Sequence, residues 1–384
     1  MKARVSVSKL VEVLELVRRV PSDKTTIPSC AGVKLEFFED NTLKVHANNT
    51  REWVTATLKE GVEVDSAGVM VVPAKRFVGW VKTFSVGKVL LSESEKLALT
   101  LNLSVGKART RVKCYAESDF PPVPVIDEVG KDGAIFHVKS DDFQGKLRSV
   151  SWARKQERDF LLQQRAINLL CRADGTAQVR TFNGIGALSM ANLELENPKP
   201  RENELNVYIP DEFLKVAIFT DDNIEVVVVG KRVQFSQDNL LWGGLLLVGM
   251  FPDASSLFKD KGNLPKVSLP VEAFQMAVNR LGVMLENAAF CTFDMTEASF
   301  TIKSNRGGQD SASEQVPVST EGFEKGVTKS VSLSLPDVAR LLSTYTGSQF
   351  VFEFSDRLVI FSGDEVGGDW VGFMAPIVTR KETN

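Results

Sequence analysis

An internal repeat constrains this chain more than any other feature of its sequence. One amphipathic segment occurs three times, about 130 residues apart, at 6–20, 140–154 and 269–283. In a second repeated segment, a run rich in Val and Leu leads through a proline into a short helix pattern, with the prolines at Pro73, Pro210 and Pro336. The first turn of a helix accepts proline because the missing N–H has no partner there. The repeat therefore predicts three similar units in tandem, each with two helices.

Between the helix patterns, the sequence alternates or runs in β-branched and aromatic residues, which is typical of strands. Such strands are expected at 33–37, 97–103, 224–229, 232–235, 290–293, 299–303, 350–354 and 358–361. Linkers rich in proline, glycine and charge follow the first two units. The sequence therefore predicts an α+β protein of three tandem domains, at 1–125, 133–253 and 266–380.

Composition and charge narrow the possible partners. The chain is 43% hydrophobic and 25% charged, as in ordinary globular proteins, and its net charge is −3. Binding to phosphates must therefore come from a local face. We find no apolar run of the ~20 residues that a membrane span needs, no signal peptide at the N-terminus, and four scattered cysteines without paired spacing. We expect a cytoplasmic protein with no membrane partner.

Motifs for catalysis and cofactor binding are missing from the sequence. There is no phosphate-binding loop, dinucleotide-binding loop, zinc-protease helix or nucleophile elbow. The two histidines, His46 and His137, have no second ligand at metal-binding spacing. An enzyme that uses Asp142 or Asp364 is the weakest hypothesis, because these acids lie at an expected helix start and in an expected turn. We expect no enzyme, no catalytic residue, no metal and no cofactor.

The repeated helices carry more positive charge than the chain as a whole. In and beside them, basic residues outnumber acidic ones by five. Helices gathered on one side of the molecule would form a positive lining suited to duplex DNA, with sequence-independent contacts, whereas the alternative for any one helix is a plain solvated face. The candidate DNA-binding residues are Lys75, Arg76, Lys82, Lys146, Arg148, Arg154 and Lys155.

Five short motifs recur in a specific order along the chain: Thr26-Ile27-Pro28, Val72–Phe77, Ser118–Pro121, Gly249–Asp253 and Met374–Ile377. Together with the threefold repeat, they resemble the bacterial-type sliding clamp, the beta subunit of DNA polymerase III, over nearly the whole chain. The resemblance implies a head-to-tail homodimeric ring whose helices line a hole around duplex DNA. It also implies a tether for DNA polymerase that docks the clamp loader and other proteins with clamp-binding motifs.

The same resemblance assigns candidate site residues. Lys24 matches a basic position that contacts DNA in the family. Ring closure would join the segment 109–113, through Thr110 and Val112, to Val283, Met284 and the strand at 299–303 of the other copy. The peptide-binding cleft would comprise Leu161, Thr181, Gly184, Pro252, Leu257, Met374, Pro376 and Ile377.

Several residues depart from the family pattern at this cleft. The chain has Asn183-Gly184-Ile185-Gly186 where the family commonly shows Asp-Gly-His-Arg, and Ser256 and Asp337 replace a common arginine and tyrosine. These changes indicate a divergent clamp with an altered peptide preference. The alternative hypothesis is a repetitive β-rich module that binds peptides or proteins and never encircles DNA.

Overall fold

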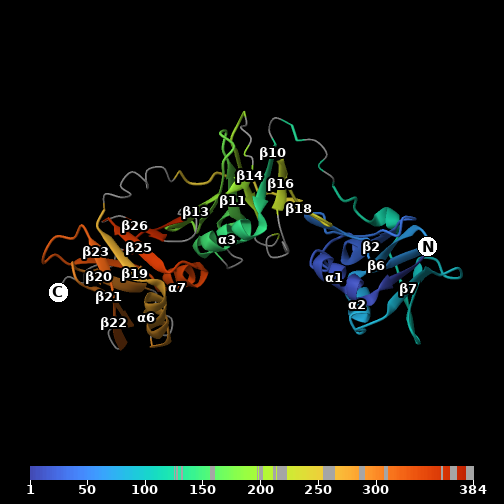
Figure 1. The fold of residues 1–384 in the computed structure, drawn as a ribbon, viewed down its shortest axis with the longest axis horizontal. Coiled ribbons are helices and arrows are strands. Elements are labelled where there is room, and N and C mark those ends of the chain that lie inside the picture. Colours follow the sequence, from blue (N-terminus) through green and yellow to red (C-terminus); the bar gives the residue numbers. More distant parts are fainter. Residues whose placement is uncertain are drawn as a thin grey trace. The chain divides into compact units, whose positions relative to one another are not determined.

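The computed structural model describes residues 1–124, 126, 129–130, 133–155, 161–196, 198, 202–210, 213, 223–253, 264–284, 290–306, 310–355, 358–363 and 370–377. The chain forms two compact units, and each is described on its own. Unit 1 comprises Met1–Ser140 and Asp211–Leu246, and unit 2 comprises Asp141–Pro210 and Leu247–Asn384. Helices and antiparallel sheets occur in both, as the α+β prediction requires (Figure 1).

Unit 1 contains two antiparallel sheets. One runs in the order β5-β1-β7-β8-β9, and the other in the order β10-β16-β17-β18-β4-β3-β2-β6 (Figure 1). The strands are β1 (Lys2–Ser6), β2 (Gly32–Phe37), β3 (Leu43–Asn48), β4 (Glu52–Leu58), β5 (Val62–Ser66), β6 (Gly68–Pro73), β7 (Lys88–Glu93), β8 (Thr100–Val105), β9 (Ala108–Lys113), β10 (Ala134–Lys139), β16 (Asn223–Val229), β17 (Arg232–Gln237) and β18 (Leu240–Leu245).

Two α-helices of unit 1 follow strands directly, as the repeat predicts. Helix α1 (Val7–Val17) continues from β1, and α2 (Ala74–Val81) continues from β6 through Pro73. Each helix buries apolar residues three or four positions apart, so the opposite faces stay in solvent. Two short 3-10 turns, η1 (Pro28–Ala31) and η2 (Glu117–Asp119), also belong to this unit.

Unit 2 also contains two antiparallel sheets. Their orders are β15-β11-β12-β13-β27-β26-β25-β19-β23 and β22-β21-β20-β24. Their strands are β11 (Ile167–Cys171), β12 (Ala177–Phe182), β13 (Ala187–Leu193), β15 (Leu205–Ile209), β19 (Lys266–Pro270), β20 (Phe290–Met295), β21 (Phe300–Arg306), β22 (Asp310–Val316), β23 (Ser319–Glu321), β24 (Lys329–Ser334), β25 (Gln349–Phe354), β26 (Val359–Gly363) and β27 (Trp370–Met374). The short strand β14 (Leu195–Glu196) lies outside these two sheets.

Aromatic side chains pack helix α6 (Val271–Met284) of unit 2, which carries Phe274, against both of its sheets. The ring of Phe274 lies 5.3 Å from that of Phe352 and 5.9 Å from that of Phe300, centroid to centroid, and all three residues are buried. Such edge-to-face contacts add to the free energy of apolar burial. The helical segments of this unit are α3 (Ser140–Val150), η3 (Ser151–Ala153), α4 (Leu162–Arg165), α6 (Val271–Met284) and α7 (Leu335–Thr344).

The sheets run through the expected domain boundaries. In unit 1, β18 of the middle repeat pairs with β4 of the first, and in unit 2, β13 of the middle repeat pairs with β27 of the third. Because strand pairing ties the middle repeat to both neighbours, its strands are divided between the two compact units. The three domain limits taken from the sequence therefore stay a prediction.

The repeat itself is visible in the order of elements. A strand leads straight into a helix at β1–α1, β10–α3 and β19–α6, and again at β6–α2 and β24–α7. The sixth expected helix, which begins near Pro210, lies outside the described residues except for Phe213, which is helical.

Candidate functional sites

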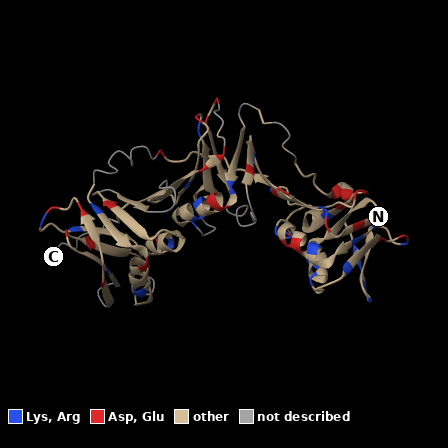
Figure 2. Cartoon of the chain, viewed as in Figure 1, with Lys and Arg blue, Asp and Glu red and all other residues tan. Residues whose placement is uncertain are grey.

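A basic surface lies on the exposed side of the two helices of unit 1. Lys75 and Arg76 project from the face of α2 that lies opposite its buried residues, and Lys24 is exposed in the loop after α1. Within the residues that the structure describes, none of these three side chains forms an ion pair. Figure 2 shows the positions of Lys and Arg along these helices in blue. All three are therefore free to meet phosphates.

A hollow of about 340 Å³ is lined by α2 along its length and by the segment that follows α1. Bases from both helices line it, together with small residues and one acid. Its lining comprises Arg18, Pro21, Asp23, Ala31, Ala74, Lys75, Val78, Gly79 and Lys82. Two of its three bases, Arg18 and Lys82, are bound by Glu15, so Lys75 is the lining base without an ion pair among the described residues.

The charge of Lys82 is compensated across the two helices, which the sequence did not reveal. Lys82 Nζ lies 2.6 Å from a carboxylate oxygen of Glu15, and Arg18 Nε donates a 2.6 Å hydrogen bond to the other oxygen. The hydrogen bond from Lys82, followed by that from Arg18, holds the pKa of Glu15 below its ordinary value. Lys82 thus has an acidic partner on the neighbouring helix, although its own helix contains no acid.

The bases of unit 2 divide into exposed and engaged residues. Lys146 is only 5% exposed, so its assignment to a DNA-contacting surface is wrong for this conformation. Arg148 is exposed. The Arg154 guanidinium donates to the carbonyl oxygens of Ser151 and Arg165, both at 3.3 Å, so it braces the turn that follows η3. Lys155 is half-buried beside it.

Unit 2 contains a buried apolar cluster, here called the apolar floor, that includes Phe251 and Phe373, the sequence neighbours of the expected cleft residues Pro252 and Met374. The buried residues of this floor are Ala166, Leu188, Met190, Tyr208, Phe251, Ile360, Val371 and Phe373. Thr181 and Met374 are also buried, and the Thr181 hydroxyl donates to the carbonyl of Val150. These two expected cleft residues therefore belong to the interior of the unit.

Other expected cleft residues are accessible. Leu161, Pro252 and Ile377 are exposed, and Pro376 is half-buried. Leu257 lies outside the described residues.

Hydrogen bonds to the Asn183 side chain organise the loop from Asn183 to Ala187. Asn183 Oδ1 accepts hydrogen bonds from the backbone N–H groups of Ile185, Gly186 and Ala187, at 2.9, 3.0 and 2.9 Å. Gly184 and Gly186 have φ values of +81° and +155°, which residues other than glycine rarely adopt. The loop consequently holds Ile185 in solvent, where it is 73% exposed.

Exposed apolar residues near this loop extend the expected cleft beyond the sequence assignment. Leu162 begins the short helix whose Gln164 packs against Gly184, and both Val248 and Met250 are exposed, Met250 by 94%. Gln163 Nε2 donates to the carbonyl of Val248, 3.3 Å away, which ties the two segments together. Sequence reasoning missed this set because isolated apolar residues in loops carry no periodic signal.

Two of the strands that lie at sheet edges, β9 and β22, bear on the expected subunit boundary. Within the described residues, β9 pairs only with β8, and β22 pairs only with β21. The strand at 299–303, expected at the subunit boundary, corresponds to β21, which has neighbours on both sides, so the edge belongs to β22 instead. Val283 and Met284 end α6 with 78% and 71% exposure, whereas Val112 is buried and Thr110 half-buried.

In the described part of the chain, His, Cys, Asp and Glu side chains form no group of three or more that could hold a metal ion. None of the described helices is long and apolar enough to cross a membrane. Asp364, one of the two acids considered for catalysis, lies outside the described residues, and Asp142 accepts a hydrogen bond from the backbone N–H of Glu194.

Comparison with known proteins gives matches along the whole chain. The family model for the N-terminal domain of the DNA polymerase III beta subunit matches residues 1–124. The beta sliding clamp of Bacillus subtilis (strain 168) is 22% identical over 411 residues, which cover 99% of this chain and 96% of that protein. The beta sliding clamp of Staphylococcus epidermidis is also 22% identical, over 94% of this chain and 90% of its own length.

Solved structures show the same fold. The crystal structure of the DNA polymerase sliding clamp from Bacillus subtilis superposes with a TM-score of 0.86 at 19% identity and covers 99% of both chains. That of the beta subunit from DNA polymerase of Streptococcus pyogenes superposes with a TM-score of 0.86 at 15% identity and covers 99% of this chain and 100% of its own.

Proposed function

We propose that this chain, a divergent member of the DNA polymerase III beta sliding-clamp family, is a DNA sliding clamp that encircles duplex DNA and tethers the replicative polymerase in the cytoplasm. It acts as a tether and not as an enzyme. The observation that carries the proposal is the match to sliding clamps over nearly the full length of the chain. The same match favours the clamp over a peptide-binding module that never encircles DNA.

DNA contact is assigned to the free bases on the helices. Lys24, Lys75, Arg76 and Arg148 are exposed and, among the described residues, have no ion-pair partner. Each phosphate that they neutralise contributes about −0.9 to the slope of log K against log salt. A few such contacts give weak, sequence-independent binding, which suits a protein that is held on DNA by topology and must slide.

Ring closure is assigned to two of the sheet edges, β9 and β22. The β9 edge of one copy would pair with the β22 edge of a second copy, and the reciprocal pair would close a head-to-tail dimer. The exposed Val283 and Met284 of α6 supply apolar surface near β22 that such a contact would cover, because α6 packs against β22.

Partner docking is assigned to the apolar surface of unit 2. The exposed Leu161, Ile185, Met250 and Ile377 lie in the same unit as the buried apolar floor and would receive anchor residues of short linear peptides. DNA polymerase, the clamp loader and other proteins with clamp-binding motifs are the proposed ligands. The replacement of the family's basic residues by Ile185 and Gly186 predicts a preference for apolar over acidic peptide residues here.

Charge reversal on the helices tests the proposal. A variant with Lys24→Glu, Lys75→Glu and Arg76→Glu should lower affinity for duplex DNA roughly tenfold and reduce clamp-dependent DNA synthesis. The matched control is Lys96→Glu, which alters an exposed lysine between β7 and β8, outside the helices, that has no ion pair among the described residues. The control should behave as the parent protein. Unchanged DNA affinity and synthesis in the triple variant would refute the assigned DNA surface.

A further inference from the structure

The edge strand β9 carries a row of free positive charges. Arg109, Arg111 and Lys113 alternate with Thr110 and the buried Val112, so the three bases share the solvent face of the sheet. None of the three has an ion-pair partner among the residues that the structure describes. Alternate residues on a strand lie roughly 7 Å apart, so the row presents three evenly spaced cations.

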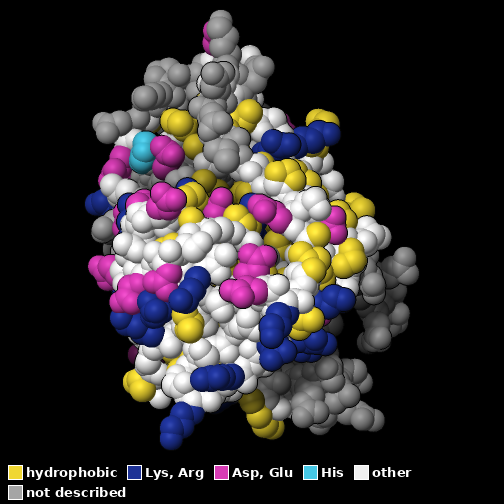
Figure 3. Space-filling model, turned by 90° about the vertical axis from the view of Figure 1, so that its right-hand side faces the viewer, with side chains coloured by type: hydrophobic (Ala, Val, Ile, Leu, Met, Phe, Trp, Pro, Cys, Tyr) yellow, Lys and Arg dark blue, Asp and Glu magenta, His cyan; other side chains and the backbone are white. Residues whose placement is uncertain are grey.

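Other bases on the same face of this sheet are neutralised, which sets the β9 row apart. Lys2 and Arg4 of β1 both approach Asp65, at 3.5 and 3.0 Å, and Lys88 of β7 pairs with Glu63. On β8, the neighbour of β9, the residues opposite the row are neutral: Ser104, Asn102 and Thr100. Figure 3 shows dark-blue side chains grouped over the lower half of one face of the molecule.

The second copy in the proposed ring would leave this row without carboxylates. When two sheets join edge to edge, their buried faces must lie on the same side. On β22 the buried face holds Val316 and Glu314, and the Glu314 carboxylate is already bound by Arg280 at 2.8 and 2.9 Å. The face that would continue the cationic row presents only Ser311, Ser313 and Gln315.

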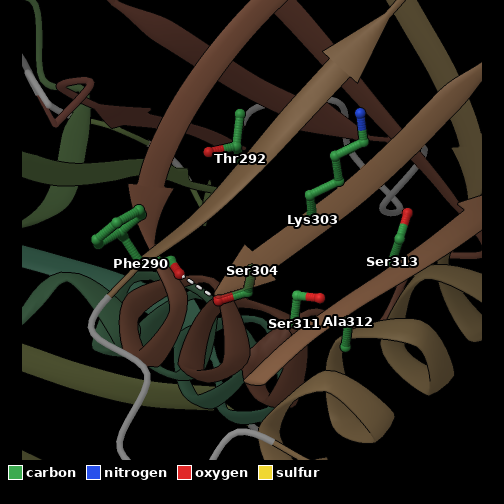
Figure 4. A pocket seen from close by; sticks show the side chains of 7 residues that line it. All are labelled: Phe290, Thr292, Lys303, Ser304, Ser311, Ala312 and Ser313. Atoms are coloured by element: carbon green, nitrogen blue, oxygen red, sulfur yellow. Dashed lines mark hydrogen bonds between the residues drawn. The ribbon is translucent and has the colours of Figure 1, made fainter. Parts of the chain in front are cut away.

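The described residues around this face of β22 are uncharged or already form an ion pair. Ser311 and Ser313 line a hollow of about 370 Å³ with Thr292 and Lys303 (Figure 4). Lys303 Nζ lies 2.6 Å from Asp294, so this base already compensates the nearest carboxylate. The second copy therefore offers the β9 row hydroxyl and amide groups but no free acid.

We propose that β9 is also the docking edge for an extended acidic segment of another protein, with Asp or Glu at alternate positions. Such a segment would satisfy the free backbone edge by strand addition and place carboxylates beside Arg109, Arg111 and Lys113. A nucleic acid could use the three charges but not the backbone edge, which favours a peptide. The inference rests on the proposed ring closure, because an acidic strand on β9 competes with the second copy and opens the ring.

The test uses two labelled synthetic peptides on the full-length protein, one alternating Glu with Thr and one alternating Gln with Thr. By fluorescence anisotropy, the Glu peptide should bind roughly tenfold more tightly than the Gln peptide, since each exposed ion pair contributes a severalfold gain. The variant R109S/R111S/K113S should lose this preference, and R111S alone should lose part of it. The matched control K88S removes a base that is already paired on the same face and should keep it.

Light scattering on the same samples completes the test. The Glu peptide should shift dimers toward single copies, and the Gln peptide should not. Equal binding of both peptides, or an unchanged preference in the triple variant, would overturn the inference. Tighter binding of a single-stranded oligonucleotide through the same three residues, without loss of dimer, would also overturn it. If the protein is a single copy at all concentrations and the preference still depends on the row, the ring proposal fails and the docking edge stands.

Discussion

Replacing Asn183 by Ala should loosen the loop that presents Ile185. One carboxamide oxygen accepts three backbone hydrogen bonds there, and Asn183 itself is buried. Water can replace the bonds to Ile185 and Gly186, which are exposed or half-buried, but not the bond to the buried Ala187. The loss is therefore about one buried, unsatisfied N–H, or roughly 1–3 kcal/mol of local opening free energy.

That magnitude corresponds to about 5- to 150-fold faster amide exchange in the loop, because about 1.4 kcal/mol is a factor of ten. Hydrogen exchange followed by mass spectrometry measures it on the peptide that contains Ile185. The matched variant Asn183→Asp keeps an acceptor oxygen at this position and should exchange much more slowly than Asn183→Ala. Equal protection in all three proteins would refute the view that Asn183 organises the loop.

Three further predictions concern charge and packing. Glu15→Gln should free Lys82 and raise affinity for duplex DNA severalfold at neutral pH, measured by anisotropy. The pKa of Glu15 is lowered, so its ion pair with Lys82 is present above the ordinary Glu pKa and is lost as the pH falls through the lowered value. The gain in DNA affinity from Glu15→Gln should therefore shrink as the pH falls through that lowered pKa. Phe274→Ala should destabilise unit 2 by about 3–5 kcal/mol, seen as a lower unfolding temperature by calorimetry, and an unchanged temperature would contradict the aromatic core. Gly243→Ala should sharply reduce thermal stability, because a Cβ there would lie 2.2 Å from the buried Trp53 ring, and a fully stable variant would contradict that packing.

The repeat and its helices could be predicted because their signals are local. Apolar residues at helical spacing mark α1, and a proline in the first turn marks the helix after β24. Lys146 was wrongly assigned although the signal was present. It lies three residues after Phe143 and four before Val150, so helical spacing puts it on the same buried stripe as both.

Other features depend on contacts between distant segments. The partner of Lys82 is Glu15, from a helix far earlier in the chain, and no local pattern connects them. The true sheet edge β22 was missed because its sequence, Asp310–Val316, is almost entirely polar and lacks the apolar alternation that identified β21. Ile185 was noticed as a departure from a family pattern, but its exposure follows from the geometry of its loop.

The central claim is that two copies of this chain close into a ring around duplex DNA. Negative-stain electron microscopy of the purified protein tests it most directly. The account predicts two-copy, closed particles with a central hole wide enough for a DNA duplex. Compact particles without a hole at every protein concentration would contradict it.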